Sequence, residues 1–74
     1  MRLTYRNARD LLPPGDTVYS RSEFFFGGVE PATVLEVCDG WLETSVGILD
    51  FDDHGVTWWL TKKVAEEATE GERI

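Results

Sequence analysis

The sequence predicts an α+β fold in which a short N-terminal helix precedes a roughly four-stranded antiparallel sheet. Three observations lead to this prediction. Apolar residues follow a helical spacing over residues 4–12, β-branched and aromatic residues dominate from residue 16 onward, and Asp39 and Gly40 give a turn signal between two such segments. At 74 residues the chain has room for one small domain. The sheet then either carries the helix on one face or curls into a small, partly open barrel.

The helix is predicted over residues 4–12, with Thr4 as its N-cap. Its apolar side chains recur at helical spacing, at Tyr5, Ala8, Leu11 and Leu12. The Pro-Pro-Gly sequence at residues 13–15 ends the helix, because the residue before a proline avoids helical backbone angles and glycine permits a reversal.

The strands are predicted from runs of β-branched and aromatic residues separated by turn residues. The segment at residues 23–31 reads as a strand end followed by a loop, because a one-sided strand cannot bury three consecutive phenylalanines. Asp39 and Gly40 predict a hairpin with a two-residue turn, and residues 52–55 predict a second hairpin. Residues 1–68 form the predicted domain and residues 69–74 a flexible polar tail. The predicted strands are residues 16–20, 33–38, 41–45, 47–51 and 56–61.

The net charge limits the classes of partner. Seven Lys and Arg oppose fourteen Asp and Glu, which gives −7 and an isoelectric point near 4.4. Such a chain repels nucleic acid and anionic membranes and attracts basic proteins. The lone Cys38 excludes an intramolecular disulfide and favours a cytoplasmic location. No stretch is predicted to be a signal peptide or a membrane span.

The charges are unevenly placed along the chain. Residues 1–21 carry a net charge of +2, whereas residues 22–60 hold eight acids and no Lys or Arg. Alternate strand residues lie on one face about 6.6 Å apart, within roughly a factor of two of the phosphate spacing along one DNA strand. An acidic sheet is therefore expected to fit a groove built for phosphates. The alternative is that these acids form only a solvated face.

Sequence signals for catalysis, metals and cofactors are weak. Residues 50–55 imitate the start of a calcium loop, but position twelve is Thr61 where a glutamate is needed, so Asp52, Asp53 and an exposed His54 are expected to build a turn. Nothing brings Cys38 and His54 together as a nucleophilic pair, and no glycine-rich phosphate loop is present. We predict no enzyme, no metal and no cofactor.

Aromatic residues make up 12% of the chain, enough to supply both a core and a binding anchor. Trp58 and Trp59 are adjacent, so one should fill the core while the other lies on the outer face as a possible anchor for a partner. Alternatively, a helix, the tail or a second copy covers both faces.

In size, acidity and lack of a catalytic motif, the chain resembles the small accessory proteins of phages and mobile elements, including anti-CRISPR proteins. The resemblance is one of general character over the whole chain and gives no residue a role. It implies an acidic protein, in a bacterial host if phage-encoded, that inhibits or modulates a basic nucleic-acid-binding partner. The residues predicted to bind that partner are Glu36, Glu43, Asp50, Asp52, Asp53, Phe25 and Trp59. The alternative is a structural or assembly module that can form a homodimer and has no inhibitory role.

Overall fold

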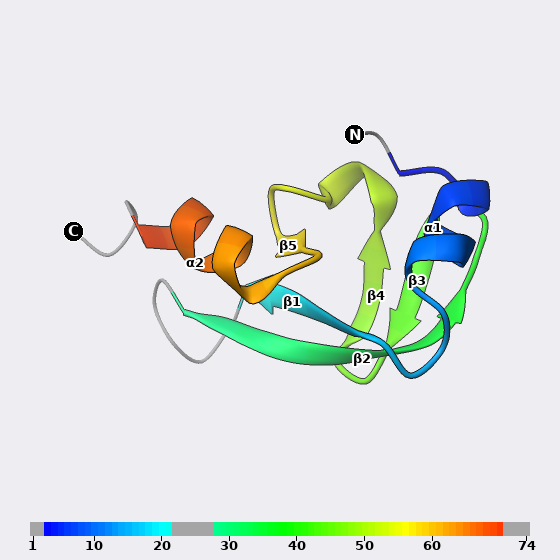
Figure 1. The fold of residues 1–74 in the computed structure, drawn as a ribbon, viewed down its shortest axis with the longest axis horizontal. Helices are drawn as coiled ribbons and strands as arrows, with labels where there is room; N and C mark the ends of the chain where they lie inside the picture. The colour runs from blue at the N-terminus through cyan, green and yellow to red at the C-terminus, as the bar shows by residue number, and fades with distance from the viewer. Residues whose placement is uncertain (1–2, 22–27, 71–74) are drawn as a thin grey trace.

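A computed structural model describes residues 3–21 and 28–70 of the chain. The described residues form a curled, five-stranded antiparallel sheet with one helix at each end, in the strand order β4-β3-β2-β1-β5. Figure 1 shows the long β1–β2 hairpin running along the molecule, with β3, β4 and α1 at one end and α2 at the other. The predicted α+β class with a curled sheet is confirmed. The elements are α1 (Tyr5–Leu11), β1 (Thr17–Arg21), β2 (Val29–Val37), β3 (Trp41–Thr44), β4 (Gly47–Asp50), η1 (Phe51–Asp53), β5 (Trp58–Trp59) and α2 (Lys62–Glu70).

Helix α1 starts where the sequence predicts. The Thr4 backbone N–H donates to Asn7 Oδ1 at 2.8 Å, and the Asn7 N–H donates to Thr4 Oγ1 at 3.3 Å, so the two residues form a reciprocal capping box. Ala8 and Leu12 are buried against the sheet. Tyr5 and Leu11, on the same predicted stripe, are exposed, because seven residues bury only a narrow strip of a helix.

Strand β2 includes Pro31, which the sequence analysis had placed in a loop. Thr33, two residues further on, directs both backbone groups away from β1 and pairs with Ser45. The nitrogen of Pro31 also points away from β1, towards the side on which β3 pairs with β2. At Pro31, however, β2 already extends beyond the end of β3, so no strand lies opposite this nitrogen. Its missing N–H therefore breaks no ladder hydrogen bond.

The predicted hairpin around Asp39 and Gly40 joins β2 to β3, and the Cys38 N–H donates to the Trp41 carbonyl at 2.9 Å. Of the two turn residues, only Gly40 has a positive φ, at 104°. Strand β2 bulges between Val34 and Glu36, so that one extra residue, Leu35, enters the strand. This bulge decides which side of the sheet the following residues face.

The second predicted hairpin is wrong. Strand β5 does not pair with β4 but with β1, at the opposite edge of the sheet. The 3-10 turn η1 and a crossing segment replace the predicted turn at residues 52–55. The curl of the sheet nevertheless brings β5 back to β4, because Trp58 Nε1 donates to the Asp50 carbonyl at 2.7 Å. One indole hydrogen bond thus joins the two edges of the half-barrel.

Helix α2 continues to Glu70, although the sequence analysis had predicted a polar tail from Thr69 onward. Thr69 is fully buried. Its hydroxyl donates to the Ala65 carbonyl at 3.0 Å, so this buried polar group has a hydrogen-bond partner within its own helix. Of the predicted tail, residues 71–74 lie outside the described residues.

Candidate functional site

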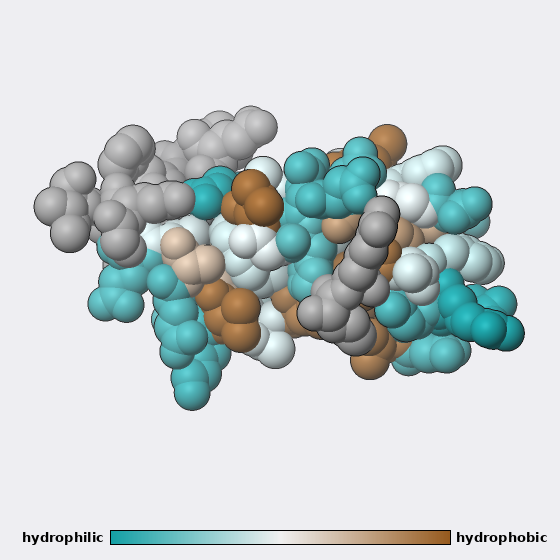
Figure 2. Space-filling model, turned by 90° about the horizontal axis from the view of Figure 1, so that it is seen from above, coloured by the Kyte–Doolittle hydropathy of each residue, from teal (hydrophilic) through white to brown (hydrophobic). Residues whose placement is uncertain are grey.

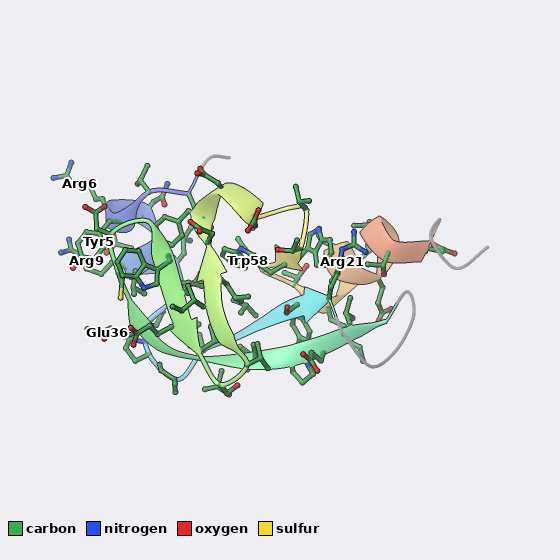
Figure 3. All side chains as sticks on the ribbon, turned by 180° about the vertical axis from the view of Figure 1, so that it is seen from behind. Tyr5, Arg6, Arg9, Arg21, Glu36 and Trp58 are labelled. Atoms are coloured by element: carbon green, nitrogen blue, oxygen red, sulfur yellow. The ribbon has the colours of Figure 1, made fainter. Side chains whose placement is uncertain are left out.

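The candidate site is the part of the outer sheet face that no described helix covers, which we call the acidic face. Its side chains come from β3, β4 and the end of β2, and they point away from the core formed by Leu42, Leu49 and α1. Figure 3 shows Glu36 on β2 at the same end of the molecule as the arginines of α1. The acidic face consists of Leu35, Glu36, Cys38, Trp41, Glu43, Ile48 and Asp50.

Three carboxylates that the sequence analysis singled out meet on this face. Glu36 lies directly opposite Glu43 in the ladder, and Asp50 lies opposite Trp41 on the next strand pair. Two like charges in a direct cross-strand pair destabilise a sheet. None of the three pairs with a cation among the described residues, whose one recorded ion pair is Lys62–Glu66. The face therefore presents uncompensated negative charge.

The bulge at Leu35 is what turns Glu36 outward. Val34 is buried, so strict alternation along β2 would point Glu36 towards the core as well. The extra residue shifts the register by one, which leaves Glu36 exposed and turns Val37 towards the core. The Glu36–Glu43 pair is thus a product of the bulge.

Cys38 joins the same carboxylate pair. Its Sγ and the carboxylates of Glu36 and Glu43 lie within 4.8 Å of one another. Burial, together with the negative charge of Glu36 and Glu43, raises the pKa of the Cys38 thiol above its ordinary value. A protonated thiol is a poor nucleophile and a poor metal ligand. These surroundings therefore favour the protonated form of Cys38.

Apolar side chains accompany the acids. The exposed fractions are 67% for Ile48, 58% for Leu35 and 37% for Trp41. Ile48 lies opposite Glu43 in the ladder, and Trp41 follows Gly40 directly after the turn. The sequence analysis missed all three, although Trp41 and Glu43 share one strand face by simple alternation.

Asp52 and Asp53, also predicted to bind a partner, lie in η1. Asp52 lines an open hollow of about 400 Å³ with Asp39, Asp50 and the apolar residues Leu3 and Phe51. Asp53 is exposed and does not line this hollow. The structure therefore brings Asp52 beside the acidic face through Asp50 and leaves Asp53 outside it.

The prediction that one tryptophan of the pair is exposed is wrong. Trp58 has 0% exposure and Trp59 has 2%. Trp58 belongs to the main core, whereas Trp59 and Ala65 are both buried outside that core, and α2 contacts β5, β1 and β2. Helix α2 therefore packs at the end of the sheet where Trp59 lies, and the Arg21 guanidinium is 5.5 Å from the Trp59 ring. Phe25, the other predicted aromatic anchor, lies outside the described residues.

His54 is half-buried, whereas the sequence analysis had placed it at an exposed turn tip. Its ring packs against Trp58 with centroids 4.9 Å apart. Burial lowers the pKa of His54, so the neutral form is favoured. His54 is thus part of the packing that supports the closure between Trp58 and β4.

Two hollows of the described surface are open to solvent. The second one, about 290 Å³, lies along α2 and is lined by Lys63 and three glutamates. Neither hollow contains Cys38 or His54. On the side seen in Figure 2, hydrophobic residues appear as separate patches between hydrophilic ones. This geometry suits contact with a surface better than enclosure of a small molecule.

Comparison of the chain with protein-family models, with curated proteins and with solved structures found no match. Among the described residues, no helix is both long enough and apolar enough to cross a membrane.

Proposed function

We propose that this chain is a small acidic binding protein that inhibits or modulates a basic, nucleic-acid-binding partner, in the manner of anti-CRISPR proteins or other nucleic-acid mimics. The observation that carries the proposal is the set of carboxylates on the acidic face: Glu36, Glu43 and Asp50 lie together without a described cation. Lys and Arg side chains of a partner would relieve the repulsion among these three acids, so their placement favours binding of a basic protein. A cytoplasmic setting is part of the proposal.

The distribution of the basic residues also supports the acidic face as the binding surface. The described bases lie on α1, β1 and α2, and none lies on the strands that form the acidic face. An approaching basic protein is therefore drawn to the sheet and repelled by Arg6 and Arg9 of α1. Such steering raises the association rate and weakens as salt screens the charges.

The test is a tagged pull-down from a nuclease-treated lysate of the source host, eluted stepwise with salt and then with competitor duplex DNA. We expect a basic nucleic-acid-binding protein to be released by either step. The triple variant Glu36→Gln/Glu43→Gln/Asp50→Asn should lose this protein. The control Asp10→Asn/Glu67→Gln/Glu70→Gln removes the same charge elsewhere and should retain it. Equal loss from both variants would contradict a site on the acidic face.

A second candidate function is the assembly module. The observation in its favour is the open edge of the sheet at β4, where Ile48 is the most exposed of the large apolar residues described. A mass that rises with concentration, combined with indifference to basic proteins, would favour assembly over inhibition.

A further inference from the structure

The acidic face carries as many apolar side chains as acidic ones, and charge attraction alone gives these apolar groups no role. Leu35, Trp41 and Ile48 are exposed on the same face as three carboxylates. Exposed apolar side chains gathered on one face mark interaction surfaces, whereas scattered ones do not. A partner that matched only the charges would leave this apolar surface in water or bury it against polar groups.

The spacing of these groups fits a helix lying across the sheet face. Because of the bulge, Leu35 and Glu36 both face Glu43 on one side, and Ile48 lies on its other side. Neighbouring strands are about 4.8 Å apart, so Leu35 and Ile48 flank Glu43 across roughly 10 Å. This span is close to the diameter of an α-helix, about 10–12 Å with its side chains.

The sheet edge is a poorer site for an extended segment. Strand β4 has only four residues. The carbonyl of Asp50 already accepts the Trp58 indole N–H at 2.7 Å. Few backbone groups of this edge are left for an added strand, and strand addition depends on such groups for its affinity. The face of the sheet therefore suits a partner segment better than the β4 edge does.

A second copy of this chain is a poor occupant of the face. Each chain carries a net charge of −7, and stacking two acidic faces would bring Glu36, Glu43 and Asp50 against their counterparts. Like charges brought together at an interface oppose association. Charge complementarity requires a partner segment that presents basic side chains to these three carboxylates and apolar side chains to the residues beside them.

We infer that the acidic face binds an amphipathic helix of the partner, whose apolar stripe contacts Leu35, Trp41 and Ile48 while its Lys and Arg side chains reach Glu36, Glu43 and Asp50. The inference rests on the proposed function and specifies the kind of segment that the basic partner contributes. It predicts that affinity depends on the order of residues in the ligand as well as on its charge.

Two synthetic 18-residue peptides of identical Leu and Lys composition test this. In the first, leucines recur at i, i+3, i+4 and i+7; in the second, the same residues are scrambled so that no stripe forms. Calorimetric titration at physiological salt should show that the striped peptide binds at least about tenfold more tightly than the scrambled one. Equal affinities would overturn the inference.

Matched variants locate the binding surface. Ile48→Ser should weaken the striped peptide about tenfold and leave the scrambled peptide unchanged. Val64→Ser removes a comparably exposed apolar side chain from α2 and should change neither affinity. Both substitutions lie on the surface, so circular dichroism should show an unaltered fold. An equal effect of both variants would overturn the assignment to the acidic face.

The failures of the two proposals are distinguishable. If the scrambled peptide binds as tightly as the striped one, and both are released by salt and weakened by Glu43→Gln, a charge-based function stands and the helix inference is overturned. If neither peptide binds at low salt, both proposals fail. Sedimentation that shows self-association abolished by Ile48→Ser would make a second copy the occupant and also overturn the inference.

Discussion

The outer face of the sheet has two halves that carry similar side chains but differ in what covers them. By the alternation of the strands, Trp59 and Trp41 point to the same side of the sheet. Trp59 is 2% exposed, whereas Trp41 is 37% exposed. The first lies in the half beside β1 and β5, where α2 packs, and the second lies on the acidic face.

The difference shows that one sheet face has a half beside α2 and a half that no described helix covers. The covered half contains Tyr19 and Arg21 beside Trp59, and the one carboxylate on its described strands, Glu30, lies opposite the buried Ser20 and so points to the other side of the sheet. Helix α2 itself carries exposed glutamates, so it would be repelled by the Glu36–Glu43 pair. The carboxylates thus occupy the half that residues 3–21 and 28–70 leave uncovered, and this placement supports the proposed role in binding.

The largest expected effect comes from truncating the two tryptophans in turn. Trp59→Ala should lower the free energy of unfolding by about 3–5 kcal/mol, since it removes a fully packed ring. Trp41→Ala should lower it by about 1 kcal/mol or less, because much of that ring is already in water. Urea unfolding followed by far-ultraviolet circular dichroism measures both. Similar losses would contradict the division into covered and uncovered halves.

A smaller effect should follow from disturbing the cover itself. Ala65→Arg places a long charged side chain at a fully buried position of α2 and should cost about 2–4 kcal/mol, while Ala68→Arg, at an exposed position of the same helix, should cost less than about 0.5 kcal/mol. If α2 covers Trp59, only Ala65→Arg shifts the tryptophan emission to longer wavelength. An unshifted spectrum in a folded Ala65→Arg variant would show that something other than α2 shields the ring.

Local signals in the sequence predicted local structure well. The Thr4 cap, the end of the first helix before residues 13–15 and the turn at Gly40 all follow from residues within four positions of one another. Each depends on backbone angles or a single capping hydrogen bond, which neighbouring residues determine. The predicted β2–β3 hairpin is correct for the same reason.

The errors concern contacts between distant segments. The turn residues 52–55 predict that β5 pairs with β4, but β5 pairs with β1, some forty residues away in the sequence. Thr69 looked too polar to pack, yet its hydroxyl is satisfied by its own helix. The pairing of β5 and the burial of Thr69 both depend on where β5 and α2 dock against the sheet, which no short sequence pattern encodes. The burial of Trp59 follows from the same docking.

The site was partly predictable from residue type and alternation. The sequence predicts that the acidic residues Glu36, Glu43 and Asp50 lie on strands, and the pairing of these strands brings them to one face of the sheet. The route to that face was not predictable, since Glu36 reaches it only through the bulge, for which the sequence gives no signal. The bulge also sets Cys38 beside the two glutamates.

The smallest expected effect tests the charge of the uncovered half through Cys38. Burial and the charges of Glu36 and Glu43 raise the pKa of this thiol, so removing one charge favours the thiolate. Glu43→Gln should therefore increase the rate of alkylation by iodoacetamide at pH 8 by about twofold, because only the thiolate reacts. High salt should reduce the difference between the two proteins, since salt screens exposed charges. The matched control Glu67→Gln removes the same charge from α2 and should leave the rate unchanged. If Glu43→Gln reacted no faster than the unmodified chain, the Glu43 carboxylate would not act on the Cys38 thiol, and the negative potential that the acidic face is proposed to offer a basic partner would be too weak to detect at its own centre.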